Sequence, residues 1–360
     1  MTTSFAIVSN LFFQSKLAGT DMSVKKVRVA RGAFYSHFID EFERRGGPVQ
    51  TWMEDAGLPL VMREDPDSYV SSSAFWSFLS RAEKNIGEVE ATGNAVRSLR
   101  LGTFSLPTRT AISTAPTLIS GLQQLVQWCP HENSDRSLWL DNRHPEYIRV
   151  FSSSAFSKLG YHANYLQNWA AIEVVRHFAG SSWVPAEIAF QSKLPPDERF
   201  YEDVVGARLF EGQTSAWISI PKKQVARMLS ASTVLNMVQA AAGSVAMADN
   251  EAIRELLKAF IRDGKSVSVE QAAEWCGLSL RTLQRLLTKT GSSFRSLLHE
   301  ARCEIATEHL MDGDTRVIDV AMALGYQDSS HFTRAFRKVT GLTPTEFQRQ
   351  LQKRAGNPLH

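Results

Sequence analysis

Hydrophobic residues recur every three or four positions through residues 251–360, and this spacing predicts a series of amphipathic helices. Glycines and helix-capping residues separate the helices. Ser268, with Gln271 three residues later, forms a capping box at the start of a short helix that Gly277 ends. Residues 251–353 are therefore expected to form an all-helical domain, and residues 354–360 a short tail.

This helical region contains two copies of one unit. Ala273 and Gly277 in the first copy match Ala321 and Gly325 in the second at a spacing of 48 residues. Each unit is a short helix, a tight turn that begins at glycine, and a second amphipathic helix. A long helix, expected from about residue 294 to residue 311, joins the two units. The pattern is typical of two helix-turn-helix units, in which the second helix lies in the major groove of DNA.

The outward faces of the two second helices carry cations and no acidic residues. The first face holds Arg281, Gln284, Arg285 and Thr288; the second holds Ser330, Arg334, Arg337 and Lys338, flanked by His331 and Thr333. Arginine suits the O6 and N7 atoms of guanine, glutamine suits adenine, and serine, threonine or histidine are adaptable partners. Lys289, Arg337 and Lys338 lie further along the helices, where phosphate contacts are expected. A solvated bundle surface would explain either face alone, but its recurrence in two copies favours DNA binding.

Residues 26–229 mix helical and strand patterns. Phe34, Phe38 and Phe42 recur at helical spacing, and residues 165–178 read as another helix. Short stretches rich in β-branched or aromatic residues predict strands at 137–140, 147–151, 184–190 and 216–220. The mixture predicts an α+β domain built on a mixed or antiparallel sheet. Residues 1–25 are expected to be a tail, and the Ala-rich residues 230–250 a linker.

Composition and charge narrow the class of protein. The chain of 360 residues is 43% hydrophobic and 21% charged, which excludes a disordered or fibrous protein. It contains no apolar run long enough to span a membrane and no signal-peptide pattern, so a cytoplasmic protein without a membrane partner is expected. The formal net charge is +3; residues 251–360 carry 16 Lys and Arg against 13 Asp and Glu, whereas residues 1–250 carry 24 of each. The small surplus matters only because cations gather on the two faces above.

Patterns typical of enzymes and metal sites are missing from the sequence. There is no GxSxG, GxGxxG or GxxxxGK[ST] motif, the nine histidines have no zinc-ligand spacing, and Cys129, Cys276 and Cys303 are scattered. We therefore expect no catalytic residue, no metal and no cofactor. Trp169 and Trp183 are weak candidates for a pocket that binds an effector, although an ordinary core is the preferred interpretation of their aromatic cluster. Two alternatives stay open: an enzyme in residues 30–229 fused to a helical DNA anchor, and an architectural DNA binder.

Residues 251–353 resemble the DNA-binding domain of the AraC/XylS family of transcription regulators. The resemblance is carried by Asp319–Ala321, Leu324–Tyr326, His331–Lys338, Gly341–Pro344 and Phe347 in the second copy, and by Ser279–Arg285 and Gly291–Phe294 in the first. It implies two helix-turn-helix subdomains that read successive major-groove segments of a double-stranded operator. By position, the base contacts it implies are Arg281, Gln284, Arg285, Ser329, Ser330, His331, Thr333 and Arg334. The first reading helix tends to be the more specific in that family, so Arg281 and Arg285 rank highest.

The N-terminal region resembles the effector domain of the ornithine-regulator-like branch of the same family. The resemblance rests on residues 115–117, on Trp183–Phe190 and on the stretch from Leu194 to Tyr201. It implies a domain that senses a small metabolite and has the capacity to dimerise, and a partnership with RNA polymerase. Together the two resemblances imply an effector-responsive transcription regulator, most simply an activator.

Overall fold

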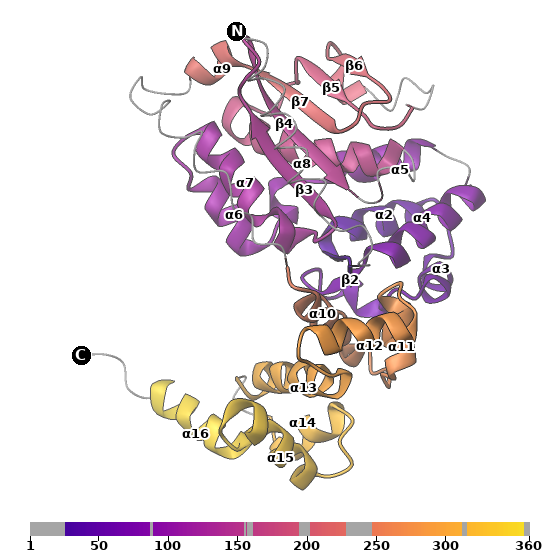
Figure 1. The fold of residues 1–360 in the computed structure, drawn as a ribbon, viewed down its shortest axis with the longest axis vertical. Helices are drawn as coiled ribbons and strands as arrows, with labels where there is room; N and C mark the ends of the chain where they lie inside the picture. The colour runs from indigo at the N-terminus through magenta and orange to yellow at the C-terminus, as the bar shows by residue number, and fades with distance from the viewer. Residues whose placement is uncertain are drawn as a thin grey trace.

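The structure, a computed structural model, describes residues 26–86, 89–154, 156, 161–193, 202–227, 247–311 and 315–355. The expected tail 1–25 and most of the expected linker 230–250 lie outside these residues. The described chain forms an α+β domain followed by an all-helical domain with two helix-turn-helix units joined by a long helix (Figure 1). This is the predicted fold class, which is confirmed.

The N-terminal domain alternates helices with short strands. Its elements are β1 (Val29–Arg31), α2 (Ala33–Arg44), α3 (Val49–Ala56), η1 (Leu60–Arg63), β2 (Tyr69–Ser71), α4 (Ser72–Ile86), α5 (Val89–Ser98), η2 (Leu101–Thr103), α6 (Leu106–Ser113), α7 (Leu118–Glu132), β3 (Arg136–Asp141), β4 (Tyr147–Ser154), α8 (Tyr161–Ala179), β5 (Glu187–Ala189), β6 (Arg208–Phe210), β7 (Ala216–Pro221) and α9 (Lys222–Arg227).

The main sheet has five strands in the order β3-β4-β7-β5-β6. All neighbours are antiparallel except β5 and β6, which are parallel, so the sheet is mixed. Phe151 in β4 lies opposite both Trp139 and Trp217; its ring stacks on that of Trp139 and is tilted against that of Trp217. The strand expected over 184–190 is shorter, Glu187–Ala189, because Pro185 has no N–H to give to a ladder. Strand β6 was not predicted, since its three residues carry no apolar run.

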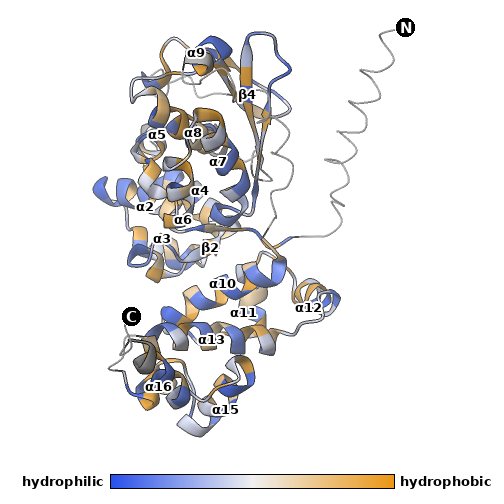
Figure 2. Ribbon diagram, turned by 90° about the vertical axis from the view of Figure 1, so that its left-hand side faces the viewer, coloured by the Kyte–Doolittle hydropathy of each residue, from blue (hydrophilic) through white to orange (hydrophobic). Residues whose placement is uncertain are grey.

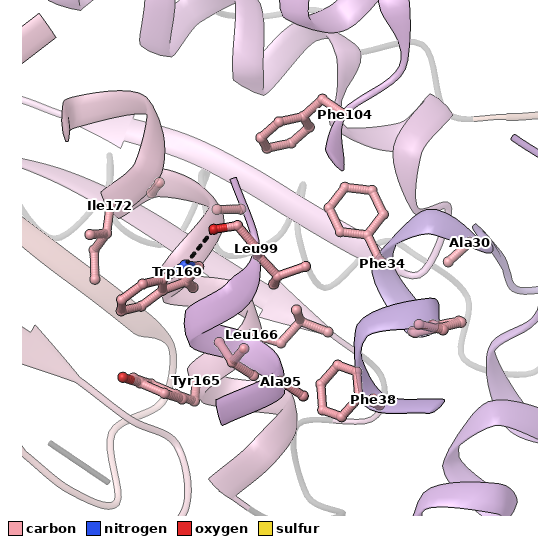
Figure 3. Close-up of a cluster of buried hydrophobic side chains, with 14 of the residues drawn as sticks. Ala30, Phe34, Phe38, Ala95, Leu99, Phe104, Tyr165, Leu166, Trp169 and Ile172 are labelled. Carbon is pink, nitrogen blue, oxygen red and sulfur yellow. Dashed lines mark hydrogen bonds between the residues drawn. The ribbon is translucent and has the colours of Figure 1, made fainter. Parts of the chain in front are cut away.

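The core of this domain lies between α2, α5, η2 and α8. Phe34 and Phe38 of α2 face Leu166 and Trp169 of α8, with Leu99 between them (Figure 3). Trp169 is 1% exposed, and its indole N–H donates to the carbonyl oxygen of Leu99 at 3.4 Å. A buried tryptophan is more stable where its indole N–H has such a hydrogen-bond acceptor. The preferred interpretation of Trp169, an ordinary core residue, matches this placement.

The C-terminal domain contains the predicted helices. They are α10 (Asp249–Arg262), α11 (Val269–Trp275), α12 (Leu280–Lys289), α13 (Phe294–Met311), α14 (Val317–Ala323), α15 (Ser329–Thr340) and α16 (Pro344–Ala355). The capping box forms as expected: the hydroxyl of Ser268 accepts from the N–H of Gln271, and the Gln271 side chain accepts from the N–H of Ser268. The long connecting helix α13 has the predicted bounds.

An apolar seam joins the two domains at α10. Val27 and Val29, at the start of the N-terminal domain, are buried in the core of the helical domain, and Tyr69 of β2 packs against the same cluster. Figures 1 and 2 both show α10 next to β2, with α13 between α10 and the last two helices. The proposed boundary near residue 26 therefore lies close to β1, whose residues Val29 and Ala30 belong to the cores of the helical and the N-terminal domain, respectively.

Polar contacts strengthen this junction. The carboxylate of Asp263, which follows α10, accepts from the N–H of Leu60 at 3.0 Å and from the N–H of Val61 at 2.8 Å. It therefore caps η1 of the other domain, since these N–H groups begin a helical turn. Arg262 donates to Asp65 at 2.9 Å. Charge-assisted hydrogen bonds of this kind are about twice as strong as neutral ones.

The first helix-turn-helix unit also contacts the N-terminal domain. Gly277 begins its turn with a φ of +65°, and a Cβ at that position would lie 3.1 Å from the hydroxyl of Ser73 in α4. A Cβ at Gly57, at the end of α3, would lie 3.7 Å from Trp275 of α11. The turn that leads into α12 therefore lies against α4.

Candidate DNA-binding interface

Helix α12 presents one apolar and one polar face. The hydroxyl of Ser279 caps its start by accepting from the N–H of Thr282 at 3.2 Å. Leu283, Leu286 and Leu287 are buried on the inner face. The residues predicted to contact DNA from this helix are all exposed, namely Arg281, Gln284, Arg285 and Lys289. The helix is thus anchored by leucines and turns its donors outward.

Helix α15 has the same construction. Phe332 and Phe336 are fully buried, whereas Ser330, His331, Arg334, Arg337 and Lys338 are exposed. Ser329 and Thr333 are half-buried, and the hydroxyl of Thr333 donates to the carbonyl oxygen of Ser329 at 2.7 Å. Of the eight residues proposed to contact bases, these two are the least free to reach outward.

An acidic residue caps α15 beside its polar face. The carboxylate of Asp328 accepts from the N–H of His331 at 2.7 Å and lies 3.7 Å from the His331 ring. That backbone hydrogen bond is the main reason why the pKa of Asp328 is below its usual range. The carboxylate is committed to the helix end, so it leaves the arginines of the same helix without a close anion.

The cations of the helical domain fall into two groups. On the side formed by α10 and α13 they are neutralised, in the pairs Arg254–Glu304, Lys258–Glu304, Arg262–Glu308 and Lys258–Glu255. On the side of α12, α15 and the start of α13, none has a carboxylate within ion-pair distance among the residues that the structure describes; these are Arg281, Arg285, Lys289, Arg295, Arg334, Arg337 and Lys338. Exposed cations without a carboxylate partner, present on both α12 and α15, are what binding to a polyanion requires.

A groove of about 570 Å³ joins the start of α13 to α15. It brings together His331, Arg334 and Lys338, which the sequence analysis singled out, with Arg295 and His299, which it did not. Arg295 was missed because it lies outside the two reading helices, on the long connecting helix. The sequence indicated only that Arg295 lies in the first turn of the long connecting helix.

His299 has a pKa below its usual range. Burial is the main cause, and the cations of Arg295, Arg302 and Lys338 add to it. Its ring lies 3.5 Å from the hydroxyl of Tyr326. The nearby cations thus disfavour the protonated form of His299. A bound anion in this groove would reduce that effect.

Elsewhere the candidate chemistry is sparse. Trp169 and Trp183 do not line this groove, and the indole N–H of Trp183 donates to the side chain of Gln224 at 2.9 Å. Cys129, Cys276 and Cys303 are buried, and burial raises the pKa of each thiol to about 12. Within the described ranges, no group of three or more His, Cys, Asp or Glu side chains is arranged to hold a metal ion, and no helix has the length and apolarity to cross a membrane.

Known proteins resemble both halves of the chain. Residues 272–350 match the family model of a helix-turn-helix domain. The ornithine utilization regulator of Pseudomonas aeruginosa is 30% identical over 169 residues, which is 45% of this chain and 49% of that protein. The transcriptional activator NphR of Rhodococcus is 34% identical over 84 residues, 23% of this chain and 25% of that protein. These alignments therefore span about half of the first relative and a quarter of the second.

The solved structure of the transcriptional regulator CdpR from Pseudomonas aeruginosa aligns with 86% of this chain and 98% of its own, at a TM-score of 0.35 and 19% identity. Residues 46–229 match the family model described as the arabinose-binding domain of AraC transcription regulators, N-terminal. That match alone spans more than half of the 360 residues, so the chain belongs to the family of AraC transcription regulators.

Proposed function

We propose that this regulator binds a specific double-stranded operator through α12 and α15, each placed in one of two adjacent major-groove segments. The observation that carries the proposal is the outward set of unpaired cations on α12, α15 and the start of α13. Arg281, Gln284 and Arg285 would read bases from α12, and Ser329, Ser330, His331, Thr333 and Arg334 from α15. Lys289, Arg337 and Lys338 would neutralise phosphates.

The second part of the proposal is that the N-terminal domain regulates DNA binding. We infer that it binds a small-molecule effector, because it belongs to a family of ligand-binding domains and is joined to the first helix-turn-helix unit by the contacts of Asp263 and Gly277. An effector changes DNA binding only if its affinity differs between the two states of that junction. The relatives are transcription regulators, which favours a non-enzymatic domain.

The remaining partners follow from this assignment. A cytoplasmic activator that engages RNA polymerase is the simplest form of such a regulator, and one relative is named as an activator. One chain already carries both reading helices, so a monomer suffices for a bipartite site. A homodimer, formed through the N-terminal domain, would then read two such sites.

Selection of binding sites from a random duplex library tests the proposal. Full-length protein at physiological salt should enrich a site with two elements about one helical turn, roughly 10 base pairs, apart. Arg281→Ala should weaken the selected site by about 1–3 kcal/mol and relax one base position. Arg316→Ala is the matched control, because Arg316 is exposed but already paired with Asp319 at 2.7 Å. Equal weakening of selected and random DNA by Arg281→Ala would show a phosphate contact instead.

A further inference from the structure

An open cavity of about 480 Å³ lies in the N-terminal domain, between the start of α2, the turn at Pro66 and Asp67, η2 and the start of α6. Pockets for small molecules commonly have volumes of about 300–1,000 Å³. Neither Trp169 nor Trp183 lines it. The cavity is therefore a different place from the aromatic cluster that the sequence suggested.

The charged side chains of the cavity wall are mostly positive. Arg31, Arg100 and Arg109 line it, against one carboxylate, that of Asp67. Arg31 is buried and is held by Asp67 and by Glu132, the latter at 2.8 Å. Arg31 is thus occupied by two carboxylates, and the cations left for a ligand at the opening are Arg100 and Arg109.

Neither of those two arginines has a carboxylate within ion-pair distance in the described part of the chain, although the Arg100 cation acts on the pKa of Glu173 from further away. Arg100 uses one nitrogen, Nη1, to donate to the carbonyl oxygens of Arg97 and Leu99. The side chain of Arg109 is exposed and has no hydrogen bond or ion pair with any residue in the described part of the chain. Guanidinium groups offer donors in a planar fork that matches the oxygens of carboxylates and phosphates.

Polar and apolar groups complete the wall. His37 lies 2.8 Å from the hydroxyl of Ser98 and 3.2 Å from the hydroxyl of Thr103, so its ring is fixed. Burial, with a contribution from the Arg100 cation, lowers the pKa of His37. Both ring nitrogens are thus used by hydroxyls of the protein, and the lowered pKa favours an uncharged ring in the cavity wall. Leu106 borders the cavity and is 62% exposed, which leaves an apolar surface for a ligand to cover.

The cavity wall continues into the junction with the DNA-binding domain. The N–H of Asp67 donates to one carboxylate oxygen of Asp65 at 3.1 Å, and the other oxygen of Asp65 accepts from Arg262 of α10 at 2.9 Å. The N–H of Ala33, at the start of α2, donates to the carbonyl oxygen of Pro66 at 2.8 Å. Two successive hydrogen bonds thus separate a residue of the cavity from the helical domain.

We propose that this cavity binds a small organic anion, a carboxylate or a phosphate ester, through Arg100 and Arg109, and that its occupancy is transmitted to α10 through Asp67, Asp65 and Arg262. The proposal rests on the proposed effector response and names its site and ligand class. An anion held by Arg100 and Arg109 shares the cavity with the Asp67 carboxylate, and repulsion between the two negative charges weakens the pair of Asp67 with Arg31. Loosening of Asp67 changes the support that Asp65 gives to Arg262.

The experiment measures ligand binding by full-length protein in the absence of DNA. Succinate, citrate and glycerol 3-phosphate serve as probes at matched ionic strength, with the melting temperature and titration calorimetry as readouts. We expect at least one probe to raise the melting temperature, and Arg109→Ala to weaken its binding about tenfold or more. Arg143→Ala is the matched control, since Arg143 is an exposed arginine paired with Asp141 on the β3–β4 turn, outside the cavity.

The outcomes separate the site, its ligand class and the proposed function. Binding of the carboxylates alone, or of the phosphate ester alone, identifies which anion the arginines take. No binding by any probe, or equal losses in Arg109→Ala and Arg143→Ala, overturns the site. Asp65→Asn should keep probe binding and lose the effect of the probe on DNA affinity; if that effect persists, the route through Arg262 is wrong. Because binding is measured without DNA, failure to select an operator leaves this test intact and counts only against the proposed function.

Discussion

The two helix-turn-helix units share one plan but differ in their support. The first lies against the N-terminal domain through the turn at Gly277, the end of α11 at Trp275 and the neighbouring α10. The second is packed on α13 and α16, on the far side of α13 from the N-terminal domain (Figures 1 and 2). A change in the N-terminal domain therefore reaches the first reading helix directly and the second only through α13.

The two units also differ in charge. Around α15 the cations converge on a groove with Arg295, whereas α12 carries its cations along one exposed face. Clustered cations suit phosphates, and single arginines beside a glutamine suit base edges. From this comparison we expect specificity and regulation to come mainly from the first unit, and anchoring from the second.

Removal of a core phenylalanine from the second unit should have the largest effect. Phe332 and Leu283 occupy matching core positions, and both are fully buried. Phe332→Ala should cost about 3–5 kcal/mol of local stability, because it leaves a cavity in a small core. Hydrogen exchange should then rise in α14–α16 while α10–α12 keep their protection.

Leu283→Ala is the matched variant in the first unit. It should cost about 2–5 kcal/mol, and the N-terminal domain should limit the spread of the exchange. If both variants raise hydrogen exchange uniformly through residues 249–355, the two units unfold together. The contacts of the first unit with the N-terminal domain would then not stabilise it separately from the second.

Loss of the Asp263 carboxylate should loosen the first unit from the N-terminal domain. Asp263→Ala leaves the N–H groups of Leu60 and Val61 without their acceptor; a fully buried donor left unpaired costs about 1–3 kcal/mol, and these half-buried donors should cost towards the lower end of that range. Proteolysis between the domains should become faster, as measured by the cleavage rate of the native protein. Asp55→Ala, which removes an exposed pair with Arg81, should change it little. An unchanged rate in Asp263→Ala would mean that the apolar seam alone holds the domains together.

These differences mark the limit of prediction from the sequence. The helices, their caps and their outward faces were predictable because capping and periodicity are local properties, as at Ser268 and Ser279. The junction was not, since Asp263 caps a turn about 200 residues away, and no spacing links the two. The N-terminal cavity was missed for the same reason, because Arg31, Arg100 and Arg109 come together only through the packing of β1, η2 and α6.

One arginine from each unit shows how strongly that unit reads base sequence. Arg281→Ala in the first unit should cost about 1–3 kcal/mol on the selected operator and little on random DNA. Arg334→Ala in the second unit should relax base preference less and weaken random DNA more, since Arg334 shares its groove with the cations Arg295 and Lys338. Binding titrations on selected and scrambled duplexes give the two specificity ratios. Identical ratios for the two variants would remove the assignment of specificity to the first unit.

Arg295 should contribute through charge alone. Arg295→Ala should reduce the slope of log K against log salt by about 1, the loss of one phosphate contact, and leave base preference unchanged. Titrations at a series of salt concentrations measure the slope. Arg254→Ala is the control on the neutralised side, because Arg254 already pairs with Glu304 at 2.8 Å. A lost base preference in Arg295→Ala would instead make α13 a reading element.

The smallest effect should be a pH dependence of DNA binding that belongs to the second unit. The pKa of His299 lies below 6.5 in the free protein because of burial and of the cations Arg295, Arg302 and Lys338. Phosphates in the groove would raise this pKa, so binding takes up a proton. Affinity should therefore rise by a few-fold as pH falls from about 7.5 and level off below the pKa of the free protein.

Titrations of DNA binding between about pH 5.5 and 8 test this coupling. His299→Gln removes the titrating group and should flatten the profile, whereas His309→Gln, an exposed histidine on the same helix, should leave it unchanged. Because α12 has no histidine, a truncated operator that keeps only the first element should show no such dependence. A pH effect of equal size on that half-site would place the titrating group outside the groove, and the division between a reading unit and an anchoring unit would lose this support.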